Sequence, residues 1–170
     1  MILNVLIDTD VLLDVFLKRE PHYTNSSTIL IRLDDGGFNG FVTATIIVNI
    51  FYHVEKYRGR EMAFACVRTL LTNSDIVILD VDRSVLLAAL DSGMSDFEGA
   101  VQAVAAQFAG INMIVTRNIR DFRNAPIPTL DTRGTFAENR VDFPSVTGIM
   151  FACSIPQKPF RQEPTMLVLG

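Results

Sequence analysis

Acidic residues follow two apolar runs that the sequence predicts to be buried strands. Asp8 comes directly after the run at residues 2–7, and Asp121 follows the run at residues 113–115. In open parallel sheets, ligands bind beyond the carboxyl ends of the strands. Carboxylate oxygens at such a place are the ligands that Mg²⁺ and Mn²⁺ prefer. The pattern therefore predicts a site for a hard divalent cation.

A third set of polar residues, Ser95, Asp96 and Glu98, lies at the start of a predicted helix at residues 97–108. Ser95 and Glu98 have the spacing of a capping box, in which serine caps the helix and glutamate reaches back to it. This capping role is the favoured interpretation of Glu98, and cation binding is the alternative. Asp96 either complements the helix dipole or faces the cation.

The composition excludes several other chemistries. With two histidines, two cysteines and no glycine-rich phosphate loop, the chain supports neither a nucleophilic triad, a P-loop nor a histidine-rich zinc site. A net charge of −4 argues against a polycation that coats nucleic acid. A local basic cluster of Arg117, Arg120 and Arg123 could still bind phosphate, although most such clusters are solvated faces.

Apolar runs alternate with helical periodicity along most of the chain. The expected strands lie at residues 2–7, 40–44, 76–79, 113–115 and, as a short edge strand, 126–130. The expected helices lie at residues 10–17, 27–33, 45–57, 61–72, 84–90 and 97–108. This alternation predicts an α/β domain with a mostly parallel sheet of four to five strands.

The character of the chain changes near its C-terminus. Residues 139–170 have no sustained period and hold four of the seven prolines, yet they remain apolar. We expect a domain at residues 1–138 and a proline-rich apolar appendage at residues 139–170 that packs on the domain or on another chain.

Three blocks together resemble the PIN-domain family. They are residues 7–14 (IDTDVLLD), 95–102 (SDFEGAVQ) and 114–122 (IVTRNIRDF), and their order and strand-end positions agree with the family over residues 2–130. The resemblance implies a three-layer α/β/α fold. It also implies an Mg²⁺- or Mn²⁺-dependent ribonuclease, often the toxin of a VapBC-type toxin–antitoxin pair, with RNA as substrate and a small antitoxin as partner.

The resemblance also implies a set of site residues. Asp8 and Asp121 match the first and last of four family acids, whereas the second falls on Asn49 and the third on Gly99. Asp96, three residues before Gly99 on the same helix face, is the nearest substitute. The predicted catalytic residues and metal ligands are Asp8, Asp96 and Asp121, with Glu98 and Asn49 as further ligands. The predicted substrate-binding residues are Thr9, Thr116, Arg117, Asn118 and Arg120.

Two functions follow from these blocks. The first is a PIN-like endoribonuclease toxin that hydrolyses RNA phosphodiesters. The alternative is a degenerate PIN module that binds RNA or a partner protein without cleavage, which Asn49 and Gly99 favour. A haloacid-dehalogenase-type phosphatase fits only the Asp-x-Asp start of the chain, because no suitably placed lysine follows.

Several smaller expectations complete the sequence-based picture. Gly99→Asp is expected to add a ligand and to improve helix propensity. Asp10 and Asp14 are expected to be solvated, and His53 to be a core or surface histidine. We expect a cytoplasmic homodimer without a signal peptide or a membrane helix.

Overall fold

The computed structural model of the chain describes residues 2–133. The predicted appendage at residues 139–170 lies outside the described residues. The described part contains five strands and six helices. Their bounds are β1 Asn4–Ile7, α1 Thr9–Leu17, α2 Tyr23–Asp34, β2 Asn39–Thr43, α3 Ala44–Arg58, α4 Arg60–Thr72, β3 Ile76–Leu79, α5 Arg83–Leu90, α6 Phe97–Phe108, β4 Met113–Thr116 and β5 Thr129–Asp131.

The strands form one parallel sheet in the order β3-β2-β1-β4-β5. Leu6 at the centre of β1 lies opposite Phe41 of β2 and Ile114 of β4. β5 is a short edge strand, and the two prolines of this segment precede its hydrogen-bonded residues, where a missing N–H costs little. The predicted parallel sheet is confirmed.

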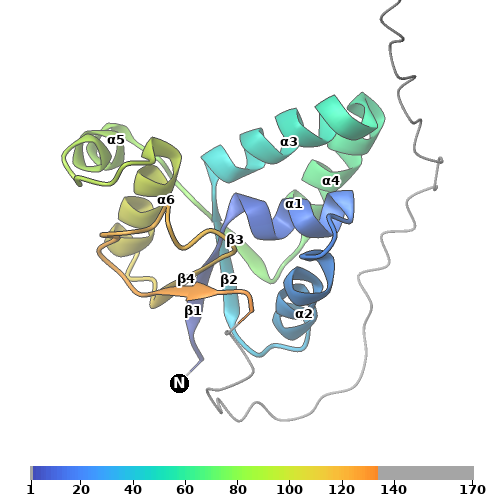
Figure 1. Cartoon of the computed structure of the whole chain (residues 1–170), viewed down its shortest axis with the longest axis horizontal. Helices are drawn as coiled ribbons and strands as arrows, with labels where there is room; N and C mark the ends of the chain where they lie inside the picture. Colours follow the sequence, from blue (N-terminus) through green and yellow to red (C-terminus); the bar gives the residue numbers. More distant parts are fainter. Residues whose placement is uncertain (1, 134–170) are drawn as a thin grey trace, which may run out of the picture.

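Alternate residues of β1 point into different layers. Val5 and Ile7 belong to the cluster that contains the buried faces of α1, α2, α3 and α4. Leu6 belongs to a second cluster, with Ala103 and Ala106 of α6. Figure 1 shows the same division, with α1 to α4 on one side of the sheet and α5 and α6 on the other. The predicted three-layer arrangement is therefore confirmed.

The pairing of β1 with β4 brings the ends of the two strands together. Ile7 lies opposite Val115, and the backbone N–H of Asp8 donates to the carbonyl of Val115 at 3.0 Å. Parallel strands end at the same edge of a sheet. Residues that are more than 100 positions apart in the chain therefore become neighbours at this edge.

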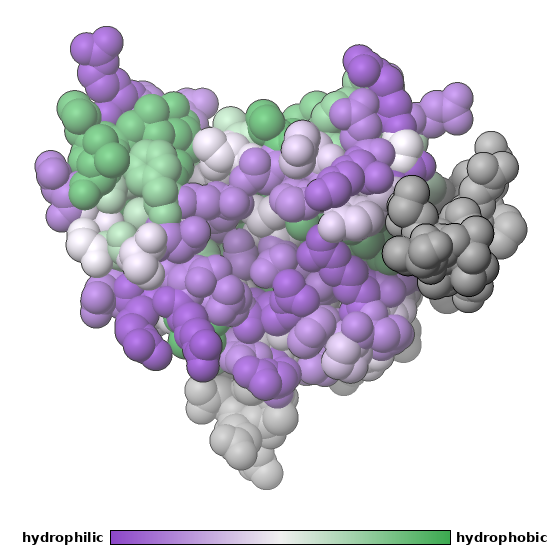
Figure 2. Space-filling model, turned by 45° about the horizontal axis from the view of Figure 1, so that its top comes forward, coloured by the Kyte–Doolittle hydropathy of each residue, from purple (hydrophilic) through white to green (hydrophobic). Residues whose placement is uncertain are grey.

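The surface of the described part is polar across the middle of Figure 2 and apolar at its left. Leu86, Leu87 and Leu90 of α5 are exposed in this part of the molecule. Among residues 2–133, no helix is long and apolar enough to cross a bilayer.

Candidate active site

Five carboxylates from three segments line one pocket beyond the ends of β1 and β4, and four of them are predicted ligands. Asp8 follows β1, Asp96 and Glu98 open α6, and Asp121 lies in the loop after β4. The pocket has a volume of about 140 Å³, and we name it the acidic pocket. It is also lined by Thr9, Asp10, Leu13, Arg19, His53, Gly99, Gln102 and Phe122.

Asp8 occupies the N-cap position of α1, but its carboxylate makes no capping hydrogen bond. It accepts a hydrogen bond from the Thr116 hydroxyl at 2.7 Å instead. The side chain is 7% exposed. Burial raises the pKa of Asp8 to about 7, and the charges of Asp10 and Glu98 add to this shift, which the Thr116 bond opposes. The Asp8 carboxylate therefore lines the acidic pocket and does not cap α1.

Glu98 is held in the acidic pocket by two donors. The Thr9 hydroxyl donates to Glu98 Oε1 at 2.8 Å, and Gln102 Nε2 donates to the same oxygen at 3.1 Å. Gln102 Nε2 also lies 3.3 Å from the Thr9 hydroxyl. Glu98 and Gln102 are four residues apart on α6 and therefore share one face of the helix. This arrangement fixes Glu98 against α1.

The capping box predicted from Ser95 and Glu98 is wrong. The N-cap of α6 is Asp96, whose Oδ2 accepts from the backbone N–H of Gly99 at 2.6 Å. Asp96 is a strong N-cap because its charge also complements the helix dipole. The helix starts one residue later than the capping box requires, which frees Glu98 to face the pocket.

Asp121 is held by a residue of its own loop. The Asn118 side-chain amide donates to Asp121 Oδ2, and the backbone N–H of Asn118 donates to the Thr116 hydroxyl at 2.9 Å. Burial is the largest cause of a raised pKa at Asp121, and the charges of Asp96 and Asp10 contribute further. Thr116 and Asn118 thus connect Asp8 and Asp121 in one hydrogen-bonded chain.

Arg117 lies against two acids of α1. Its Nη2 is 2.9 Å from Asp10 Oδ2, and its Nη1 is 3.4 Å from Asp14 Oδ1. Asp14 is 0% exposed and accepts from the Ser26 hydroxyl at 3.0 Å. The expectation that Asp14 is solvated is therefore wrong, because a guanidinium and a hydroxyl replace water around it. Asp10 is also paired, with Arg19 at 3.3 Å.

Gly99 allows a close approach between α6 and the loop that carries Asp121. A Cβ at position 99 would lie 3.0 Å from Asp96 Oδ2 and 3.3 Å from the backbone oxygen of Asp121. The expectation that Gly99→Asp simply adds a ligand and improves the helix needs correction, since any side chain at this position pushes against the cap and the loop.

The structure brings most of the predicted site residues together. Asp8, Asp96, Glu98 and Asp121 line the acidic pocket, and the four residues that hold or neighbour them are Thr9, Thr116, Arg117 and Asn118. Asn49, half-buried on α3, does not line it. Arg120 lines a neighbouring cavity.

Sequence reasoning missed four polar residues that line the pocket, namely Asp10, Arg19, His53 and Gln102. His53 lines the pocket from α3, although it was expected to be an ordinary core or surface residue. Its position one turn after Asn49 is a signal that could have found it, because residues four apart share a helix face. Gln102, four residues after Glu98, carries the same signal on α6 and lies within a block that resembles the family.

The acidic pocket fits a divalent cation by the chemistry of its donors. Within residues 2–133, no three His, Cys, Asp or Glu side chains are already arranged around one point as metal ligands. The pocket nevertheless gathers like charges that raise the pKa of Asp8 and Asp121. Gln102, which lines it, also leaves its buried Oε1 without a hydrogen-bond partner. A hard cation would relieve this repulsion, with the carboxylates turning from their present donors toward it.

The fold is a parallel sheet between two helical layers, and carboxylates gather at the edge where its strands end. This combination is that of an α/β domain with an acidic site. The PIN domain family matches residues 4–120. The chain therefore belongs to the PIN domain family, as its three sequence blocks predict. No curated protein sequence matches the chain.

Several solved structures share the fold. The toxin–antitoxin complex from Klebsiella pneumoniae is 18% identical, with 75% of this chain and 97% of that chain covered and a TM-score of 0.56. DNA-bound VapBC from Salmonella typhimurium is 18% identical, with 77% and 99% covered and a TM-score of 0.57. VapC20 from Mycobacterium tuberculosis, a sarcin-ricin loop cleaving toxin, is 12% identical, with 65% and 86% covered and a TM-score of 0.54.

Proposed function

We propose that the chain is a PIN-type endoribonuclease, the toxin of a toxin–antitoxin pair, which hydrolyses RNA phosphodiesters with Mg²⁺ or Mn²⁺. One observation carries the proposal: in a PIN domain, five carboxylates from three segments line one pocket at the ends of β1 and β4. VapC20, a structural neighbour, is a sarcin-ricin loop cleaving toxin, which supports RNA as the substrate class.

Asp8, Asp96 and Asp121 would hold the cation, with Glu98 beside them. A bound divalent ion lowers the pKa of water and neutralises charge on a phosphoryl oxygen. The chain's own residues orient the ligands: Thr116 holds Asp8, Asn118 holds Asp121, and Thr9 holds Glu98. Asn49 is left out of the proposed ligand set because it does not line the pocket.

The residues proposed to contact RNA are those that are not already bonded to an acid of the pocket. Thr9, Thr116, Arg117 and Asn118 are each bonded or paired to an acid, so we assign them to positioning the carboxylates. We assign His53, which lines the pocket from α3, to contact with the RNA backbone. This division leaves the phosphate contacts to His53 and to cations outside the acidic pocket.

The test is cleavage of a labelled, structured RNA by the full chain in Mn²⁺, Mg²⁺ or EDTA. We expect cleavage only with a divalent ion, and a loss of at least about 100-fold in Asp8→Asn and Asp121→Asn, as expected when a catalytic electrostatic group is removed. Asp91→Asn removes an exposed acid at the end of α5 and is the matched control. Equal cleavage by wild type and Asp8→Asn would contradict the proposal.

The alternative is a module that binds RNA or a partner without cutting. Gly99 favours it, because this position supplies no carboxylate and sits too close to Asp121 to accept one without movement. Calorimetric titration of Mn²⁺ into wild type and Asp8→Asn separates the two functions. RNA binding without Mn²⁺ binding or cleavage would establish the alternative.

We also propose a small antitoxin partner and a homodimer. The support is that the neighbours from Klebsiella pneumoniae and Salmonella typhimurium are toxin–antitoxin complexes. The exposed leucines of α5 offer an apolar surface for such a contact. Light scattering of the purified chain tests the dimer, and co-purification with the product of a neighbouring reading frame tests the antitoxin.

A further inference from the structure

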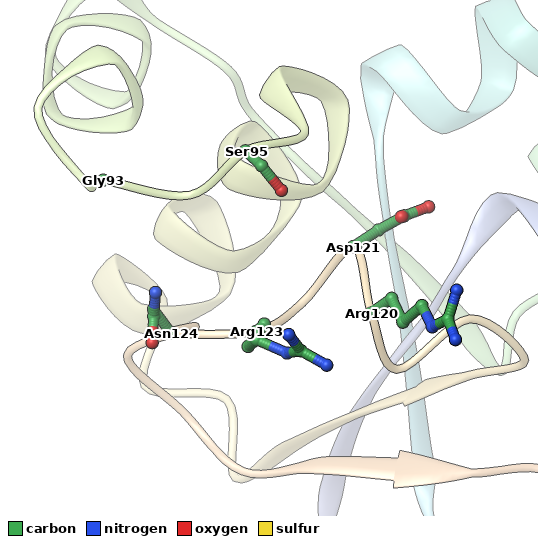
Figure 3. A pocket seen from close by; sticks show the side chains of 6 residues that line it. All are labelled: Gly93, Ser95, Arg120, Asp121, Arg123 and Asn124. Atoms are coloured by element: carbon green, nitrogen blue, oxygen red, sulfur yellow. The ribbon is translucent and has the colours of Figure 1, made fainter.

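A second, larger cavity lies beside the acidic pocket. Its volume is about 530 Å³, and its wall consists of Gly93, Ser95, Arg120, Asp121, Arg123 and Asn124. Figure 3 shows that Gly93 and Ser95 come from the segment before α6, whereas the other four residues come from the loop after β4. Asp121 lines both cavities, so the two are adjacent at this residue.

The wall of this cavity contains no apolar side chain. Pockets for small organic ligands are lined mainly by apolar and aromatic groups, and protein interfaces have an apolar centre. Neither description fits this wall. The wall has two arginines, an amide, a hydroxyl, a glycine and, where it meets the acidic pocket, the Asp121 carboxylate, and such a polar wall suits a charged, hydrated ligand.

The loop after β4 presents its two arginines outward. Phe122 is buried against α6, whereas Arg120 and Arg123 on either side of it are exposed. The backbone N–H of Arg123 donates to the carbonyl of Arg120 at 3.2 Å, which closes a turn between them. In Figure 3 both guanidinium groups extend from this turn in the same direction. An anchored turn thus holds two cations at one side of the cavity.

These two arginines differ from the others near the site in lacking an acidic partner. Arg117 and Arg19 are paired with Asp10, and Arg133 is paired with Asp131. Within residues 2–133, no ion pair involves Arg120 or Arg123. A guanidinium without a carboxylate partner is free to bind phosphate, which it matches with two parallel N–H donors.

We propose that this cavity binds a phosphate of the RNA strand next to the one in the acidic pocket. The inference rests on the proposed function, and it assigns Arg120 and Arg123 to the strand's backbone rather than to its bases. Phosphate contacts of this kind fix the position of a strand without reading its sequence. They also provide local attraction for a polyanion on a chain whose net charge is −4.

Binding is tested without cleavage, by fluorescence anisotropy of a labelled single-stranded RNA with the full chain carrying Asp8→Asn. Arg120→Gln and Arg123→Gln together should weaken binding at least about tenfold, since each removes a charge-assisted contact. The slope of log affinity against log salt should fall by about 0.7, because one single-strand phosphate is no longer neutralised. Arg68→Gln, an exposed arginine of α4 outside both cavities, is the control.

Substrate length provides the second measurement. A dinucleotide has one phosphodiester and therefore no neighbouring phosphate for the second cavity, whereas a longer RNA has one. The double variant should therefore lose at least about tenfold more kcat/KM on the longer RNA than on the dinucleotide, by the same charge-assisted contacts. Equal losses on both substrates would overturn the inference, because they would place the arginines at the scissile phosphate.

The outcomes separate this inference from the proposed function. If wild type cuts no RNA but the double variant binds RNA more weakly with a smaller salt slope, the cavity is supported and the nuclease is not. If wild type cuts RNA and the double variant binds like the Arg68→Gln control, the cavity inference fails alone. Competition by an acidic peptide as effective as RNA of equal charge would also overturn it and indicate a protein partner.

Discussion

The raised pKa of Asp8 predicts that Asp8→Asn stabilises the protein at neutral pH. The carboxylate is buried, and its environment raises its pKa from 3.8 to about 7. In the unfolded chain the same group titrates near its ordinary value. Between these values the folded protein binds more protons than the unfolded chain, so its free energy of unfolding falls as pH rises.

The size of this change in the free energy of unfolding follows from the pH range between the two pKa values of Asp8. Each pH unit inside it costs about 1.36 kcal/mol, so wild type should lose roughly 2–3 kcal/mol between pH 5 and pH 7 through Asp8 alone. Above the folded pKa both states are ionised, and the loss stops. Asparagine does not titrate, and its side-chain oxygen can still accept from Thr116. The free energy of unfolding of Asp8→Asn therefore does not fall with pH through this group.

The assay is urea unfolding followed by far-UV circular dichroism, since the chain has no tryptophan. Measurements at pH 5, 6, 7 and 8 in EDTA should show the variant gaining about 2–3 kcal/mol on wild type by pH 7. Asp91→Asn should run parallel to wild type. The other carboxylates with a raised pKa, Asp14, Asp34 and Asp121, are present in both proteins and cancel in the difference.

Parallel stability curves for Asp8→Asn and wild type would refute this reasoning, because they would show that Asp8 is ionised in the folded protein across the whole range. A second arm tests the cation. Mn²⁺ added at pH 8 should stabilise wild type by about 1.4 kcal/mol at ten times its dissociation constant and leave Asp8→Asn unchanged. Equal stabilisation of both proteins would place the ion elsewhere.

Three further predictions concern the surroundings of the pocket. Arg117→Gln should lower the free energy of unfolding by about 2–3 kcal/mol in urea, because Asp14 stays buried without its cation; a loss no larger than that of Arg68→Gln would contradict this. Gly99→Ala should destabilise by about 1 kcal/mol despite its better helix propensity, since its Cβ meets the Asp121 carbonyl; a higher melting temperature would show that the loop yields. His53→Gln should raise KM for RNA with little change in the unfolding free energy, whereas Tyr52→Phe, on the exposed side of α3, should change neither.

The sequence was sufficient to predict the fold, because the determinants of its elements are local. The run Ile76–Leu79 and the helical spacing at residues 97–108 are visible in the sequence, and alternation of the two types requires parallel crossovers. Asp8 and Asp121 were predictable for the same reason, since each follows a strand. Their position in the chain already determines the edge of the sheet to which they belong.

Other features depended on tertiary contacts that no local pattern shows. Asp14 has the sequence pattern of a solvated helix residue, but Arg117, from the loop after β4 and more than 100 positions away, lies against it. His53 has the sequence pattern of a core residue, but in the structure α3 packs beside α1 and His53 lines the pocket. Glu98 fits a capping box in the sequence, but in the structure Asp96 caps α6 and the Thr9 hydroxyl donates to Glu98.

Gly99 changes the arrangement of the acidic pocket, although the pocket keeps its carboxylates. Where the family carries an acid, this chain has a glycine, and the backbone oxygen of Asp121 would lie only 3.3 Å from any Cβ there. The missing side chain therefore lets the loop after β4 approach the first turn of α6. That approach places Asp121 beside Asp96, which is one cause of the raised pKa of Asp121. The pocket still has five carboxylates, two of them at the N-terminal end of α6, and Asp96 would have to leave its cap on Gly99 to bind the cation proposed above.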